Sequence, residues 1–162
     1  MLEQIGSMIF QTDFVFSIFR ITAPILFAAL AAVVAEKAGV TNIGLEGIML
    51  FCALFGTLFA YWTQNWFIGV CSAVVVGVFF ALLIGFFALQ LNTDIILAGI
   101  AVNTMSSGGT IFLLYMFTGE RGNTAALTSS KLLIPTVEIP ILNKIPILGD
   151  ILSGHAVLTY VA

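Results

Sequence analysis

Long uninterrupted apolar runs are the feature of this sequence that most constrains its fold. The clearest run extends from Trp66 to Leu89, with tryptophans on one side and polar residues on the other. An α-helix rises about 1.5 Å per residue, so about 20 apolar residues are needed to cross a hydrocarbon core of about 30 Å. The run is long enough, and it predicts a transmembrane helix.

The composition extends this conclusion to the whole chain. Of the 162 residues, 60% are hydrophobic and only 8% are charged, which is far more apolar surface than a soluble domain can bury. The net charge is -3 and the five Lys and Arg residues are scattered, so the chain has no basic patch for nucleic acid. These values indicate an integral membrane protein that does not bind nucleic acid.

The order of apolar and polar segments predicts an all-α fold, a polytopic transmembrane helical bundle in one membrane-spanning domain, residues 1–162. We expect spans at about 14–35, 45–62, 66–89 and 95–117, a loop at 118–155, and the start of a further span at 156–162. Because this last stretch is too short to cross the bilayer, we expect the chain to be the truncated N-terminal part of a longer protein.

The segment EKAGVTNIGLEG, residues 36–47, interrupts the apolar pattern. The apolar run after it, Ile48 to Trp62, would be only about 22 Å long as a helix, so it must borrow residues from the segment to cross the membrane. One interpretation is a discontinuous helix around residues 36–47, a common transporter device. The alternative is a tight polar turn at the surface, followed by a short tilted helix.

Two polar residues of this segment have more than one interpretation. If the helix begins at Leu45, Glu46 lies in its first turn, where a carboxylate suits the helix dipole, and Asn42 is placed to cap it. Either residue could instead contact a solute. A structural role in the loop is expected for four residues of the segment, Glu36, Gly39, Gly44 and Gly47.

Polar and small residues also occupy the middle of the predicted span 95–117. Buried polar groups are costly in lipid and usually face a bundle interior or a cavity, although hydrogen bonds between helices explain them equally well. The carboxamide of Asn103 can both donate and accept a hydrogen bond. Together with the preceding segment, this span gives the candidates for a substrate pathway: Asn42, Glu46, Asn103, Thr104 and Ser107.

Small residues recur at every fourth position of the span 66–89, which places them on one helical face. Such a row lets another helix approach closely, for packing or for a sliding seam. The row consists of Gly69, Ala73, Gly77, Ala81 and Gly85.

No enzyme, metal or cofactor site is predicted. The sequence has no GxxxxGK[ST] phosphate loop, its single histidine is His155, and no acid pair is spaced with a nucleophile. Cys52 and Cys71 both lie in apolar runs, where a thiol behaves as a small hydrophobic group. Any ATP hydrolysis would therefore belong to a partner.

Two blocks carry a family resemblance: PILFAALAAVVAEKAGVTNIGLEGIML, residues 24–50, and DIILAGIAVNTMSSG, residues 94–108. They resemble permeases of bacterial ABC importers of the branched-chain amino acid and simple sugar group, in particular the branch for nucleoside uptake. Simple sugar permeases are similar but carry G-I-D-L-S-V-G where this chain has VTNIGLEG. The resemblance therefore favours nucleosides.

What the resemblance implies is a non-catalytic, multi-pass permease subunit in a bacterial plasma (inner) membrane. Its partners would be cytoplasmic ABC ATPase subunits, a second permease subunit and an extracytoplasmic solute-binding protein. In the family the loop that couples to the ATPase follows the helix that begins here near His155, so this chain would lack it. The resemblance puts the N-terminus and the loop 118–155 outside, with residues 36–47 and 90–94 facing the cytoplasm. The positive-inside rule favours the opposite orientation.

Three alternatives remain open at this point. An ion-coupled secondary transporter also uses broken helices and buried polar groups. A simple sugar or branched-chain amino acid permease would share most of the pattern. A membrane scaffold that transports nothing would need only the row of small residues.

Overall fold

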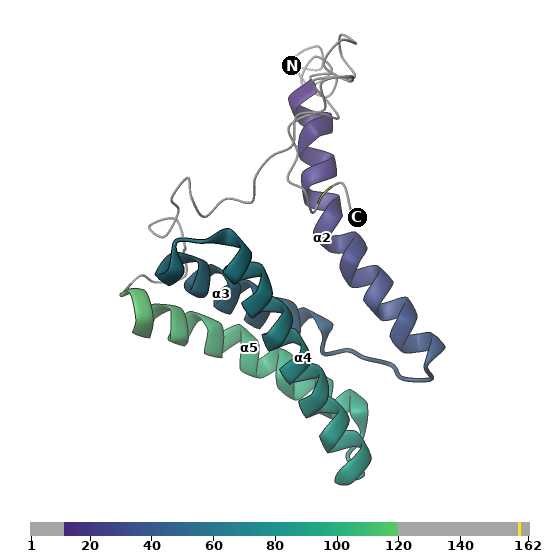
Figure 1. Ribbon diagram of the computed structural model, residues 1–162. Helices are drawn as coiled ribbons and strands as arrows, with labels where there is room; N and C mark the ends of the chain where they lie inside the picture. The colour runs from purple at the N-terminus through teal and green to yellow at the C-terminus, as the bar shows by residue number, and fades with distance from the viewer. Residues whose placement is uncertain (1–11, 120–158, 160–162) are drawn as a thin grey trace, which may run out of the picture. The chain divides into compact units, whose positions relative to one another are not determined.

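The computed structural model describes residues 12–119 and Thr159. This part of the chain forms the helices α2 (Thr12–Lys37), α3 (Leu45–Thr63), α4 (Trp66–Gln90) and α5 (Ile95–Thr118), drawn in Figure 1, and contains no strand. The predicted all-α membrane bundle is therefore confirmed. Almost all of the predicted loop at 118–155 and of the further span at 156–162 lies outside the described residues.

The chain divides into two compact units. Of the described residues, 12–31 of α2 belong to one unit. Residues 32–119, with the end of α2 and all of α3, α4 and α5, belong to the other. The candidate site lies entirely in the second unit, to which the following description is confined.

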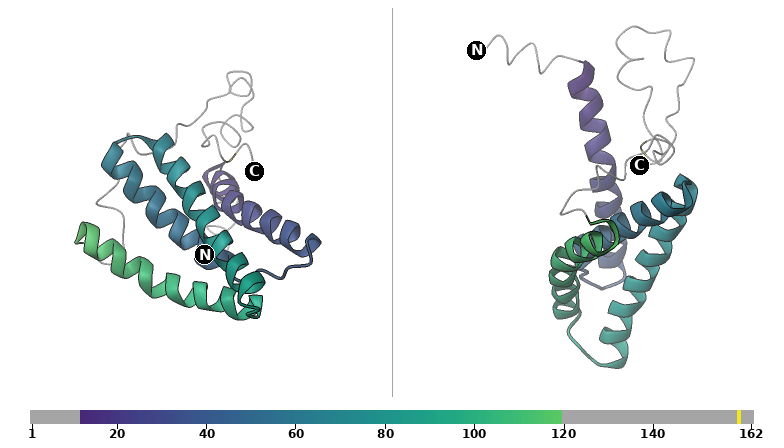
Figure 2. Two further views of the ribbon diagram at one scale, coloured as in Figure 1. Left: turned by 60° about the horizontal axis from the view of Figure 1, so that its bottom comes forward. Right: turned by 90° about the vertical axis from the view of Figure 1, so that its left-hand side faces the viewer.

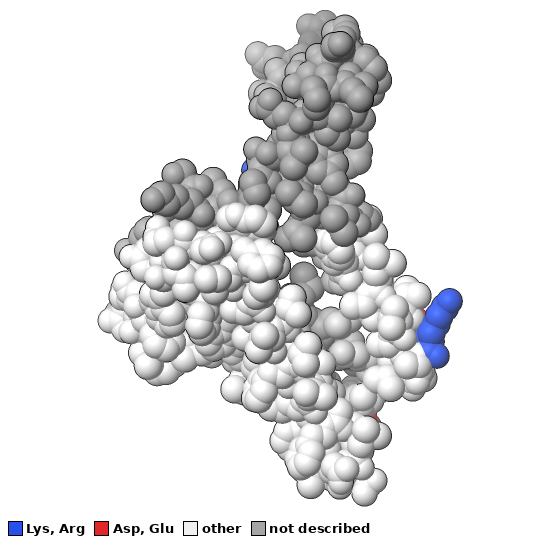
Figure 3. Space-filling model, in the orientation of Figure 1, with Lys and Arg blue, Asp and Glu red and all other residues white. Residues whose placement is uncertain are grey.

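Three helices of the described part, α3, α4 and α5, are long and apolar enough to cross a membrane. The face shown in Figure 3 is almost without charged side chains over these helices. The first predicted span, 14–35, lies within α2, and its crossing of the membrane stays a prediction. These features make the chain a multi-pass membrane protein.

Short polar turns define the ends of these helices. Between α3 and α4, Gln64 adopts a left-handed conformation, and the Oδ1 atom of Asn65 accepts a hydrogen bond from Phe67 N at 3.0 Å. Before α5, Asp94 Oδ1 accepts from Ile96 N at 2.8 Å. Each oxygen satisfies a donor that the first helical turn leaves without a partner.

The core of the second unit lies where α3 packs between its neighbours. α3 and α4 form an antiparallel hairpin, and α5 packs more closely on α3 than on α4, as Figures 1 and 2 show. Phe51 of α3 stacks on Phe80 of α4, with ring centroids 4.3 Å apart and planes 10° from parallel. A second buried cluster, formed by Leu54, Leu58 and Leu114, joins α3 to α5.

Candidate functional site

The interruption at residues 36–47 begins with a defined helix end. Gly39 has a φ of +76°, its N–H donates to Glu36 O, and Val40 N donates to Ala35 O. These two bonds form a Schellman motif, in which a left-handed residue closes the helix and satisfies its last carbonyls. Gly39 therefore ends α2, because a residue without Cβ enters this conformation without strain.

Asn42 organises the turn that follows, but it does not cap α3. Its Oδ1 atom accepts a hydrogen bond from Gly44 N at 2.9 Å, a turn closed by the side chain itself. The N-cap residue is Gly44, so the expectation that Asn42 caps this helix is wrong. The oxygen of an N-cap side chain accepts from the second or third N–H of the helix. The Asn42 oxygen accepts instead from Gly44 N, which precedes the helix.

The cap of α3 comes from another helix. The Oδ1 atom of Asn103, on α5, accepts from Gly47 N at 2.7 Å, and its Nδ2 atom donates to Ile43 O at 2.9 Å. Gly47 is the third residue of α3, which is the donor position that an N-cap side chain normally serves. One carboxamide thus binds the backbone on both sides of the start of α3.

Glycines allow the backbones to come close enough for these bonds. A Cβ atom on Gly47 would lie 2.7 Å from Asn103 Oδ1 and 2.8 Å from Val102 O. A Cβ atom on Gly99 would lie 2.8 Å from Gly44 N. Gly44, Gly47 and Gly99 are all buried. The contact between the interruption and α5 is therefore one of backbone against backbone, and side chains at these positions would prevent it.

The other polar residues of α5 bond to their own helix. Thr104 Oγ1 donates to Ile100 O, and Ser107 Oγ donates to Thr104 O, both at 2.9 Å. Both residues are exposed within the described part of the chain, as is Glu46 in the first turn of α3. Ser106 differs, because it is fully buried and its hydroxyl donates to Asn103 O.

Only the first three members of the row of small residues on α4 pack against α3. A Cβ atom on Gly69 would lie 2.7 Å from the Cβ of Ala60, and one on Gly77 would lie 3.2 Å from Cys52 Sγ. Ala73 faces Gly56 between them. Ala81 is exposed, however, and a Cβ atom on Gly85 would meet no atom within 4 Å.

The partner row on α3 was not anticipated from the sequence. Its members are spaced four residues apart, as on α4, so the spacing could have revealed them: Cys52, Gly56 and Ala60.

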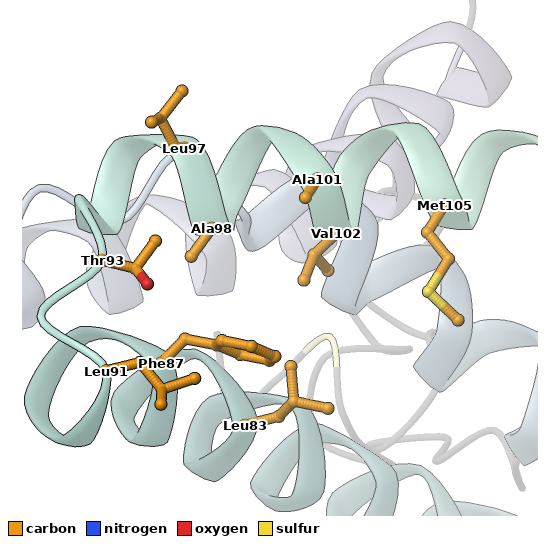
Figure 4. Close-up of a pocket in the computed structure, with 9 residues that line it drawn as sticks. All are labelled: Leu83, Phe87, Leu91, Thr93, Leu97, Ala98, Ala101, Val102 and Met105. Atoms are coloured by element: carbon orange, nitrogen blue, oxygen red, sulfur yellow. The ribbon is translucent and has the colours of Figure 1, made fainter.

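A groove of about 550 Å³ lies between α4 and α5. Figure 4 shows Leu83 and Phe87 of α4 opposite Ala101 and Met105 of α5. The side chains that line it are apolar except for the hydroxyl of Thr93, and they include the thioether of Met105. It therefore lacks the several donors and acceptors that hold a polar solute, and it was not anticipated from the sequence.

Comparison with known proteins gives two curated relatives that match 80% of the chain. The guanosine ABC transporter permease protein NupQ of Bacillus subtilis is 31% identical over 138 residues. The nucleoside ABC transporter permease protein NupC of Lactococcus lactis is 27% identical over 136 residues. The chain spans 41% of the length of either relative.

A third relative is named for a sugar and not for a nucleoside. A protein of Haloferax volcanii, provisionally named a glucose ABC transporter permease, is 31% identical over 88 residues, which are 54% of this chain and 27% of that protein. No solved structure gives a significant match. Residues 14–148 match the family described as the permease component of the branched-chain amino acid transport system, and the chain belongs to this family.

Proposed function

We propose that this chain is part of the membrane-embedded permease subunit of an ATP-driven ABC importer, and that its solute is a nucleoside. Membership in the permease family supports the transport role. The names of the guanosine and nucleoside permeases of Bacillus subtilis and Lactococcus lactis support the solute class. The complete subunit would work with ABC ATPase subunits, a second permease subunit and a solute-binding protein.

The observation that carries the proposal is the non-helical backbone at 38–44 held against α5 by Asn103. Non-helical backbone is tolerated in a membrane protein where it is buried in protein or lines a wet cavity, and transporters build substrate paths from such segments. Gly44 of this segment is buried against Gly99 of α5. Asn42 and Asn103 each bind backbone here, so their first role is to hold the path in shape. Glu46, Thr104 and Ser107 are exposed polar residues, and we propose that they face the solute.

The test uses cells in which the complete protein is the only nucleoside uptake system. Radiolabelled guanosine should enter these cells and should fail to enter a strain that lacks the gene. Uptake should persist when an ionophore removes ion gradients at constant ATP, and it should fall when ATP falls. Normal uptake in the deletion strain would refute the nucleoside proposal, and collapse with the ionophore alone would favour an ion-coupled transporter.

A sugar is the second candidate solute, because of the Haloferax volcanii relative. The same cells distinguish the two by competition. Unlabelled uridine should reduce guanosine uptake, whereas unlabelled glucose should leave it unchanged. The reverse pattern, with labelled glucose entering and uridine without effect, would select the sugar.

A further inference from the structure

We infer that Asn103 is a positioning residue of the transport path, which caps α3 from α5 and makes the interruption, the start of α3 and α5 move as one unit. The part of this inference that concerns transport rests on the proposed function. Its structural part, that the Asn103 carboxamide holds the interruption in place, stands on the geometry alone.

The first argument is the use of both ends of the carboxamide. Oδ1 accepts from Gly47 N and Nδ2 donates to Ile43 O, so the same side chain serves one donor and one acceptor of the broken backbone. Gly47 is buried, and a buried backbone group without a partner costs more than one that water can reach. Turning Asn103 toward a passing solute would therefore leave both Gly47 N and Ile43 O without these bonds.

The second argument is steric and independent of the hydrogen bonds. Gly99, one helical turn before Asn103, brings the α5 backbone against Gly44 N, and Gly47 brings the α3 backbone against Val102 O and Asn103 itself. With no Cβ at these points, the two segments are in close contact both at Asn103 and one helical turn before it. Packed contacts of this kind shift between discrete arrangements and do not slide continuously, so the two segments should move together.

The chemical requirement is specific to an amide. Aspartate at position 103 keeps an acceptor for Gly47 N but places a second oxygen against Ile43 O, while alanine removes both bonds. Thr104 is the matched control, because it is the next residue of the same helix and its hydroxyl bonds only to Ile100 O among the described contacts.

The experiment is hydrogen exchange, followed by mass spectrometry, on the intact protein in its native complex in lipid nanodiscs. Asn103→Ala should accelerate exchange in peptides that cover residues 43–47 by about five- to thirty-fold, the range for loss of a helix cap, and Thr104→Ala should not. Should Asn103→Ala fail to assemble, Asn103→Asp retains the cap acceptor and should give a smaller increase in the same peptides. Unchanged exchange in the Asn103 variant that assembles would overturn the inference.

Uptake kinetics separate positioning from contact with the solute. Asn103→Ala should lower Vmax while KM and the preference for guanosine over uridine stay as in the wild type. A changed preference would show that Asn103 takes part in selecting the solute and would overturn a role confined to positioning. Failure of the proposed function is distinguishable, because the wild type would then take up no nucleoside, while the exchange experiment, which needs no solute, would still decide the structural part.

Discussion

A Cβ atom on Gly69 of α4 would lie 2.7 Å from the Cβ of Ala60 and 2.8 Å from Gly56 O on α3. The second neighbour is a backbone atom of a helix, so it cannot retreat without moving the whole helix. Gly69→Ala should therefore push α3 and α4 apart and destabilise the protein by about 1–3 kcal/mol, the usual range for overpacking. The measurement is the midpoint of denaturant-induced unfolding of the purified protein in detergent.

The matched control for this change is Gly85→Ala, on the same helix and in the same row of small residues. Its Cβ would meet no atom within 4 Å, and alanine is the better helix former by about 1 kcal/mol. Gly85→Ala should leave stability unchanged or raise it. Equal destabilisation by the two variants would show that the α3–α4 contact is not the one described.

Gly39→Ala tests the end of α2. Gly39 has a φ of +76° and open space around its Cβ position, so the effect should come from the backbone alone. Alanine in the left-handed region costs about 1–2 kcal/mol, whereas asparagine tolerates it better. Thermal unfolding should therefore rank wild type above Gly39→Asn and Gly39→Asn above Gly39→Ala. An alanine variant as stable as the wild type would contradict the Schellman assignment.

Asp94→Ala tests the cap of α5. Asp94 Oδ1 accepts from Ile96 N, and loss of an N-cap side chain typically costs about 0.5–2 kcal/mol. Asparagine at this position would keep the acceptor and lose only the favourable interaction of the charge with the helix dipole, so Asp94→Asn is the control and should cost less. The measurement is the free energy of unfolding of both variants. Equal destabilisation by Asp94→Ala and Asp94→Asn would show that the charge matters and the capping bond does not.

Apolar length and boundary residues were enough to predict most of the helices. The predicted spans 66–89 and 95–117 differ from α4 and α5 by one residue at one end, because Trp66 and Asp94 mark these boundaries in the sequence itself. The start of α3 at Leu45 follows from the same reasoning, since the apolar run after the interruption was too short to span alone.

The binding partners of Asn103 could not be predicted in this way. Gly47 and Ile43 lie 56 and 60 residues earlier in the chain, and the register that brings them to Asn103 is set by packing of α3 on α5. The sequence indicates that the Asn103 amide in an apolar helix needs a hydrogen-bond partner, but it does not identify that partner. Sequence distance alone favours Asn42 as the cap of α3, because Asn42 lies next to the start of this helix and Asn103 does not.

Phe51→Ala tests the core between α3 and α4. Phe51 is 2% exposed and stacked on Phe80, so truncation should leave a cavity and cost about 3–5 kcal/mol. Phe112 of α5 is 64% exposed, and Phe112→Ala should change stability by only about 0.5 kcal/mol. Both are measured by denaturant-induced unfolding in detergent, and similar losses would contradict a core centred on Phe51.

Thr104 and Ser107 test the proposed path itself. Both residues are exposed and their hydroxyls donate within α5, so Thr104→Val and Ser107→Ala remove no bond between helices and should leave the protein level unchanged. If these oxygens accept hydrogen bonds from the solute, their loss should change the ratio of guanosine to uridine uptake by about two- to ten-fold, the worth of one hydrogen bond.

The control for this prediction is Ser106→Ala. Ser106 lies between the two tested positions, is fully buried, and donates to Asn103 O. Its loss should lower stability without changing the ratio of uptake. A ratio that changes in Ser106→Ala as much as in the exposed variants would mean that selectivity depends on the shape of α5, and that Thr104 and Ser107 do not face the solute.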